Sequence, residues 1–216
     1  MKLLSDCRLY TFVDTAFLAN RPPESVADQL CEGGSDLIQL RAKGFPTDEI
    51  LRIAERIIPI LNQAGVGLVI NDHPEIAAAI SAPICHLGQE DFFEAGYPHR
   101  SGCPALGGGF KIGLSSHSPA QAERAVAAGA DYVAIGPVYW TGTKPSAIPV
   151  TLELVNWATR NLSLPWFAIG GINLDNLDQV LEAGARRICV VSAILNTDDI
   201  AATCRRFKER LRSFGV

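Results

Sequence analysis

Five charged residues in this sequence follow short apolar runs, where strands would end. Arg41 and Lys43 come after "LIQL", and Lys144 comes at the end of "IGPVYWTGTK". Arginine offers a planar fork and lysine a point charge, and both suit the oxygens of phosphate groups. Asp72 and Asp91 follow two neighbouring runs, and proteins usually hold Mg²⁺ with one or two carboxylates, water and phosphate oxygens. Three cations with two acids predict a site for a pyrophosphate and Mg²⁺.

Glycines and a serine near the end of the chain predict a second anion site. Gly170 and Gly171 close an apolar run and precede the polar segment "INLDN", and Ser192 belongs to the last run. Bare N–H groups beside a helix start bind phosphate, and α/β barrels commonly carry such a site after the seventh and eighth strands. This corner is therefore expected to hold a single phosphate.

Eight apolar runs alternate with helical patterns. The runs are "RLYTFVD" (8–14), "LIQLR" (37–41), "GLVIND" (67–72), "ICHLG" (84–88), "FKIGLSS" (110–116), "YVAIGPVY" (132–139), "WFAIGG" (166–171) and "RICVVSAI" (187–194). Helices are expected at 25–31, 48–64, 75–80, 120–128, 152–160, 174–183 and 200–213. Strands that are apolar almost throughout are typical of parallel sheets covered on both faces. The pattern predicts a single-domain (β/α)8 TIM barrel over residues 1–216, with its chemistry at the carboxyl ends of the strands.

A doubly wound open sheet is the alternative fold. It normally has a glycine-rich first turn, whereas the first turn here reads "VDTAFLANRPP". The segment at 92–109 is poorly patterned, and its Gly107–Gly109 stretch is expected to be loop.

Each candidate residue also has a purely structural interpretation. Arg41 could pair with Glu49 on the following helix, and Asp72 could cap the helix that begins near "HPEIAAAI". His86 fits a satisfied structural histidine better than a base, and His117 could cap a loop. The joint occurrence of polar residues at six successive strand ends favours a functional site over these separate explanations.

Composition excludes several classes of partner. The net charge is −4 and the isoelectric point is about 5.6, with no stripe of Lys and Arg, so no nucleic acid and no membrane surface is expected as a partner. We expect neither a secretory signal nor a membrane helix, because no apolar run is long enough. Six scattered cysteines without C-x-x-C spacing indicate reduced thiols in a cytoplasmic protein. The sequence does not decide between a monomer and a homo-oligomer.

Several motifs together resemble the thiamine phosphate synthase (thiamine-phosphate pyrophosphorylase) family. They are "IQLRAKG", "INDHPEIA", "CHLGQEDF", "IGLSSHS", "GADYVAIGPVYWTGTK", "FAIGGI" and "VVSAI", in order between about residues 8 and 195. The resemblance implies a (β/α)8 barrel that joins a hydroxymethylpyrimidine diphosphate to a thiazole phosphate or its carboxylated tautomer. The sequence does not decide which of the two thiazole tautomers is used. Thiamine monophosphate and pyrophosphate are the implied products, and Mg²⁺ is the implied cofactor.

The resemblance also implies roles for particular residues. The matches to pyrimidine-diphosphate contacts are Gln39, Arg41, Lys43, Asn71, Ser115 and Lys144, of which Arg41, Lys43, Ser115 and Lys144 are the implied catalytic residues. Asp72 and Asp91 match the magnesium ligands. The matches to the thiazole phosphate pocket are Thr141, Thr143, Gly171, Val191 and Ser192. The "TGTK" turn would then face both substrates, with hydroxyls toward one phosphate and an ammonium toward the pyrophosphate.

Three rival functions stay open at this point. A thiazole tautomerase shares the barrel, but members of that branch tend to lose the residues found here as Lys43, Asp72 and Asp91. A sugar-phosphate epimerase or isomerase would use the glycine corner but does not predict the two acids. A non-catalytic protein that binds thiamine precursors would release no pyrophosphate. The sequence also departs from the resembled family in the segment after Lys144, "PSAIPVTLELV", which leaves the detail of that loop open.

Overall fold

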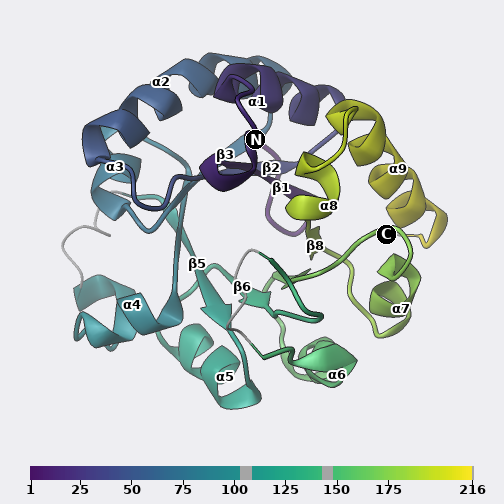
Figure 1. Cartoon of the computed structure of the whole chain (residues 1–216). Coiled ribbons are helices and arrows are strands. Elements are labelled where there is room, and N and C mark those ends of the chain that lie inside the picture. Colours follow the sequence, from purple (N-terminus) through teal and green to yellow (C-terminus); the bar gives the residue numbers. More distant parts are fainter. Residues whose placement is uncertain (103–108, 143–147, 216) are drawn as a thin grey trace.

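Eight parallel strands close into one barrel in the part of the chain that the computed structural model describes, residues 1–102, 109–142 and 148–215. Each strand pairs with the next, and β8 pairs with β1 (Figure 1). The strands are β1 Leu9–Asp14, β2 Leu37–Arg41, β3 Gly67–Asn71, β4 Ile84–Leu87, β5 Lys111–Ser116, β6 Tyr132–Ile135, β7 Trp166–Ile169 and β8 Ile188–Cys189. The predicted (β/α)8 barrel is confirmed.

Helices form a ring around the strands (Figure 1). They are α1 Pro23–Glu32, α2 Thr47–Ala64, α3 Pro74–Ala79, α4 Gln89–Glu94, α5 Pro119–Ala127, α6 Thr151–Asn161, α7 Leu177–Glu182, α8 Ser192–Leu195 and α9 Ile200–Ser213, with 3-10 turns η1 Thr15–Phe17 and η2 Arg100–Gly102. Ser118 caps α5 by accepting a bond from the Gln121 N–H, and Pro119 occupies its first turn. No helix in the described ranges is long and apolar enough to cross a membrane.

Two strands, β6 and β8, are much shorter than the apolar runs predicted. β6 ends at Ile135 rather than at 139, because Gly136 and Pro137 follow and proline cannot donate a ladder hydrogen bond. β8 covers only Ile188–Cys189, and residues 192–194, expected in the strand, begin the short helix α8 instead. An apolar run shows burial but does not show where the backbone stops pairing.

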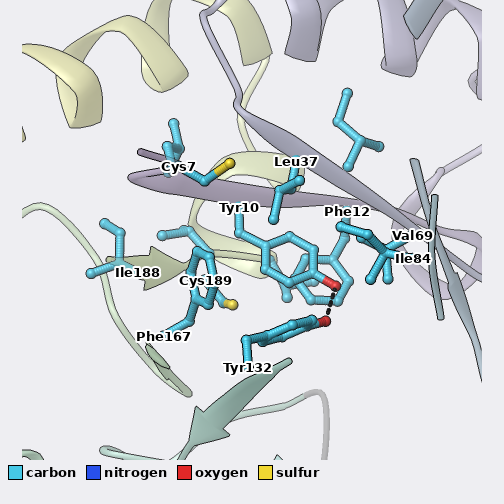
Figure 2. Packing of buried hydrophobic residues seen from close by; sticks show 14 of the residues in the cluster. Cys7, Tyr10, Phe12, Leu37, Val69, Ile84, Tyr132, Phe167, Ile188 and Cys189 are labelled. Atoms are coloured by element: carbon cyan, nitrogen blue, oxygen red, sulfur yellow. Dashed lines mark hydrogen bonds between the residues drawn. The ribbon is translucent and has the colours of Figure 1, made fainter. Parts of the chain in front are cut away.

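Aromatic rings fill the interior of the barrel. Tyr10, Tyr132 and Phe167 meet edge to face, with ring centroids 5.4 Å apart for both contacts to Phe167 (Figure 2). Gly113 lies against the Tyr132 ring, so any side chain there would collide with it. A barrel interior is packed with side chains rather than open, and the rings form the floor beneath the carboxyl ends of the strands.

A buried carboxylate ties the amino end of the barrel together. Asp36, just before β2, accepts bonds from the N–H groups of Arg8 (2.8 Å) and Leu9 (3.0 Å), and from the ammonium groups of Lys2 (2.5 Å) and Lys208 (2.6 Å). Burial alone would raise the pKa of Asp36, but the Leu9 N–H, the two ammonium groups and the Arg8 N–H outweigh it and hold that pKa below its usual value. One side chain thus links the N-terminal segment, β1 and α9.

Replacing this carboxylate should destabilise the fold in a pH-dependent way. Asp36→Asn leaves two ammonium groups without their counter-charge, so we expect the free energy of unfolding at pH 7 to fall by about 3 kcal/mol. Because the folded pKa is depressed, the contribution is present above the unfolded pKa and is lost as the pH falls through the folded pKa. Urea titrations should show the gap between wild type and variant closing below about pH 4.

The exposed Asp178–Arg210 pair provides the matched control for this experiment. Asp178→Asn removes a carboxylate of the same kind from solvent-screened surroundings, so it should change stability little. Equal losses in the two variants would contradict the anchoring role of Asp36.

Candidate active site at the carboxyl ends of the strands

One cavity opens at the carboxyl ends of the strands, and all eight strands contribute to its lining. Every predicted site residue that the structure describes lines it: Gln39, Arg41, Lys43, Asn71, Asp72, Asp91, Ser115, Thr141, Gly171, Val191 and Ser192. Thr143 and Lys144 lie outside the described residues. Parallel strands bring their carboxyl ends to one rim, which is how residues far apart in the sequence meet here.

Arg41 is held by a residue that the sequence reading missed. Its Nη1 lies 2.7 Å from Oδ2 of the buried Asp14, so the alternative pairing with Glu49 is wrong. The other carboxylate oxygen of Asp14 accepts a bond from the Ala16 N–H at 3.0 Å. Asp14 ends β1 and stands beside Arg41 in the register of β1 and β2. Asp14 therefore fixes the guanidinium at the rim of the cavity.

Asp72 has an unusual backbone conformation for a residue other than glycine. Its φ is 62°, in the left-handed region, which aspartate tolerates better than most residues. Its N–H donates to the His86 carbonyl at 2.8 Å, and its Oδ2 lies 2.7 Å from the Asn71 Nδ2 and 3.6 Å from the Lys43 Nζ. The structure contradicts a capping role, because His73 is the N-cap of α3. Strained backbone of this kind is typical of functional sites.

Asp91, in the first turn of α4, turns its carboxylate toward Gly88. A Cβ at Gly88 would collide with Asp91 Oδ2, so glycine at residue 88 leaves room for the Asp91 carboxylate. Asp72 and Asp91 both line the cavity, and their carboxylate oxygens are the donors that Mg²⁺ prefers. The described residues include no group of three or more His, Cys, Asp or Glu that could hold a metal ion. Two carboxylates suit an ion that completes its shell with water and phosphate oxygens.

The glycine corner is built differently from the expectation. The helix expected from residue 174 begins only at Leu177, because a turn precedes it. In this turn the Asn173 N–H donates to the Asn176 Oδ1, and the Asn176 N–H donates to the Asn173 Oδ1. The Asn176 Nδ2 also donates to the Gly171 carbonyl at 2.9 Å, which ties this turn to the cavity rim. Ser192 opens α8, so the helix that starts at the cavity is α8 rather than α7.

Two histidines, His86 and His117, line the cavity. The His86 Nδ1 lies 3.0 Å from the Tyr132 hydroxyl, and its Nε2 lies 3.5 Å from the Ser115 Oγ. The His117 Nδ1 bonds to the Gly136 carbonyl. His86 is thus held structurally, as the sequence suggested, but it also reaches a predicted substrate contact.

The fold and the cavity together define a TIM-barrel protein whose cavity has cations and acids on one side and a glycine corner on the other. Comparison with known proteins narrows this class. The family model described as thiamine monophosphate synthase matches residues 9–194. The chain therefore belongs to the thiamine monophosphate synthase family, and the resemblance read from its motifs is confirmed.

Individual relatives agree with the family. A thiamine-phosphate synthase of Thermus thermophilus is 44% identical over 185 residues, which cover 85% of each chain. One of Halalkalibacterium halodurans is 36% identical over 214 residues, 99% of each chain. The solved structure of a thiamine phosphate pyrophosphorylase from Pyrococcus furiosus matches with a TM-score of 0.87 and 27% identity, covering 99% of both chains.

Asp14→Asn should weaken the binding of pyrophosphate. The asparagine keeps the shape of the side chain, but it removes the counter-charge of Arg41 and releases the guanidinium from its place. We expect the Kd for pyrophosphate, measured by calorimetry, to rise roughly tenfold, since partners of a buried charge contribute on this scale. Unchanged or tighter binding would show that Asp14 does not position Arg41.

Gly88→Ala should weaken metal binding without unfolding the protein. The added Cβ displaces the Asp91 carboxylate, so the Mg²⁺ concentration that half-saturates pyrophosphate binding should rise roughly tenfold. Gly102→Ala is the matched control, because a Cβ there meets nothing within 4 Å. If Gly88→Ala and the control have the same Mg²⁺ dependence, Asp91 does not bind the ion.

Proposed function

We propose that this chain is a thiamine-phosphate synthase. The reaction joins 4-amino-2-methyl-5-hydroxymethylpyrimidine diphosphate to 4-methyl-5-(2-phosphoethyl)thiazole, or its carboxylated tautomer, and gives thiamine monophosphate and pyrophosphate. Family membership and relatives that are 36–44% identical over most of the chain support this activity. The observation that carries the proposal is that cations and acids from separate strands line one cavity beside the glycine corner.

The pyrimidine diphosphate is assigned to the side of the cavity formed by β2 to β5. Arg41 and Lys43 bring positive charge there, and Gln39, Asn71 and Ser115 add polar groups along the same wall. This arrangement suits a ligand with a polar ring at one end and two phosphates at the other. Lys144, assigned to the same substrate by the resemblance, lies outside the described residues.

The thiazole phosphate is assigned to the opposite side. Thr141, Gly171, Val191 and Ser192 line it, and they offer a hydroxyl pair with backbone N–H groups in place of cations. Such donors suit a single phosphate and distinguish this side from the pyrophosphate side. Thr143, also assigned here, lies outside the described residues.

Mg²⁺ is proposed to lie between Asp72 and Asp91, where it would neutralise charge on the pyrophosphate. The residues of the chain have separate tasks. Arg41 and Lys43 attract and orient the diphosphate, and Asp14 holds Arg41 in place. Tyr10, Phe12 and Ile169 form the apolar part of the cavity, where they keep the reacting rings close and exclude water.

The chemistry proposed is dissociative. The electron-rich aminopyrimidine supports a positive carbon, so the bond to the diphosphate breaks first and the thiazole nitrogen then captures that carbon. The nucleophile is a neutral aromatic nitrogen, which needs little general-base help. Positioning and electrostatic stabilisation would then supply most of the acceleration.

The rival activities are less well supported. A thiazole tautomerase needs no pyrophosphate site, yet Lys43, Asp72 and Asp91 all line the cavity of this chain. A purely binding role would leave the paired acids without a purpose. We also propose a cytoplasmic location, which fits the free cysteines Cys7, Cys31, Cys85, Cys189 and Cys204 among the described residues.

Pyrophosphate release tests the proposed function directly. We expect release that needs both substrates and Mg²⁺, stops when the ion is chelated, and falls at least 100-fold in Asp91→Ala because the metal ligand is lost. Glu94→Ala, which removes a carboxylate from the same helix but outside the cavity, should retain wild-type activity. No release from folded wild-type protein would overturn the proposal, and thiazole tautomerisation would then be measured.

A further inference from the structure

A continuous relay of hydrogen bonds, formed by Gln39, Tyr10, Tyr132, His86 and Ser115, crosses the floor of the cavity. The Gln39 Nε2 donates to the Tyr10 hydroxyl, which lies 3.1 Å from the Tyr132 hydroxyl (Figure 2). Tyr132 in turn lies 3.0 Å from the His86 Nδ1, and the His86 Nε2 lies 3.5 Å from the Ser115 Oγ. The five side chains come from five different strands, β2, β1, β6, β4 and β5.

The two tyrosines in the middle of this relay have no access to water. Tyr10 is 1% exposed and Tyr132 is fully buried. Burial raises the pKa of both phenols well above the usual value of 10, so both stay neutral. A neutral phenol has one proton to donate and lone pairs to accept with. Each tyrosine can therefore pass on a hydrogen bond in one direction only at a time.

The donor at one end sets the direction of every bond that follows. When Gln39 donates to Tyr10, the Tyr10 proton points to Tyr132 and the Tyr132 proton points to the His86 Nδ1. A neutral histidine that accepts at Nδ1 carries its proton on Nε2. That proton points to the Ser115 Oγ, which leaves the hydroxyl proton of Ser115 to point into the cavity.

The reversed direction would suit the proposed substrate badly. If the Gln39 amide were turned round, every bond would reverse, and Ser115 would donate to His86 and present lone pairs to the cavity. The diphosphate carries only acceptor oxygens, and Arg41 and Lys43 mark the same wall as the place of an anion. The direction with Gln39 as donor is therefore the one that matches the charge of the site.

We propose that Tyr10 and Tyr132 are positioning residues: with Gln39 they hold His86 as its Nε2–H tautomer, so that the Ser115 hydroxyl donates a hydrogen bond to the departing diphosphate. This inference rests on the proposed function, because it takes the diphosphate as the group at Ser115. Hydrogen bonds that all point the same way polarise one another, so negative charge that builds on the diphosphate strengthens the whole relay. The relay contributes most as the carbon–oxygen bond breaks.

The tautomer of His86 can be measured without any substrate. Two-dimensional ¹⁵N spectra of the imidazole nitrogens, recorded near pH 8 where histidine is neutral, distinguish the two tautomers. His86→Gln identifies the signals of His86 among the four histidines. We expect Nε2–H in wild type and a mixture in Tyr132→Phe and Tyr10→Phe, which keep the ring packing. A wild-type spectrum dominated by Nδ1–H would overturn the proposal.

Kinetics test whether the relay acts through Ser115. We expect Tyr132→Phe to lower kcat about tenfold, the scale of one hydrogen bond, with little change in the KM for the thiazole phosphate. In a Ser115→Ala background the same substitution should cost nothing further. Tyr139→Phe is the control, since its hydroxyl bonds to Gln179 outside the cavity. Independent, multiplicative losses would show that Tyr132 acts through packing alone.

The two measurements separate this proposal from the proposed function. If wild-type protein releases no pyrophosphate, the proposed function fails, and the relay fails as a catalytic device with it whatever the spectra show. If wild type is active but the tautomer is Nδ1–H, or the double-mutant cycle shows no coupling, only the relay is overturned.

Discussion

Closure of the sheet by the pairing of β8 with β1 is the constraint on which the site depends. Only Leu9 with Ile188 and Tyr10 with Cys189 form this last seam, yet it leaves no free edge in the described sheet. Because all strands are parallel, a closed barrel brings every carboxyl end to one rim. Residues as far apart in the sequence as Tyr10 and Ser192 then line one cavity.

The two ends of the barrel carry different kinds of electrostatics. At the amino end, Asp36 is satisfied by four donors, and its interactions stabilise the fold. At the carboxyl end, Lys43 and Asp72 stand 3.6 Å apart and Arg41 is held by a single carboxylate. Charges that are incompletely paired retain the capacity to bind a ligand. Asp72, one of these charged residues, has a left-handed backbone conformation, which is typical of functional sites. Stability and chemistry are thus separated along the barrel axis.

Much of the fold could be predicted because parallel strands and covering helices leave strong apolar periods. The polar residues after each run could be placed on one rim for the same reason. Asp14 could not be found this way: it reads as the last residue of an apolar run, and its pairing with Arg41 depends on strand register. In the sequence, Tyr10 and Tyr132 look like ordinary core residues. Their contacts with Gln39 and His86 join four strands, so these contacts cannot be predicted from the sequence around either tyrosine. The predicted bounds of β6, β8 and α7 were wrong. Pro137 follows the end of β6, α8 begins where β8 was expected to continue, and the Asn173–Asn176 turn delays the start of α7.

We propose that pyrophosphate and Mg²⁺ occupy the side of the cavity formed by Arg41, Lys43, Asp72 and Asp91. A crystal structure of the protein with Mg²⁺ and pyrophosphate tests it most directly. We expect an ion bound by the carboxylates of Asp72 and Asp91 and by pyrophosphate oxygens, with Arg41 and Lys43 against the same anion. Pyrophosphate seated only at Gly171 and Ser192, with no ion at the two acids, would contradict it.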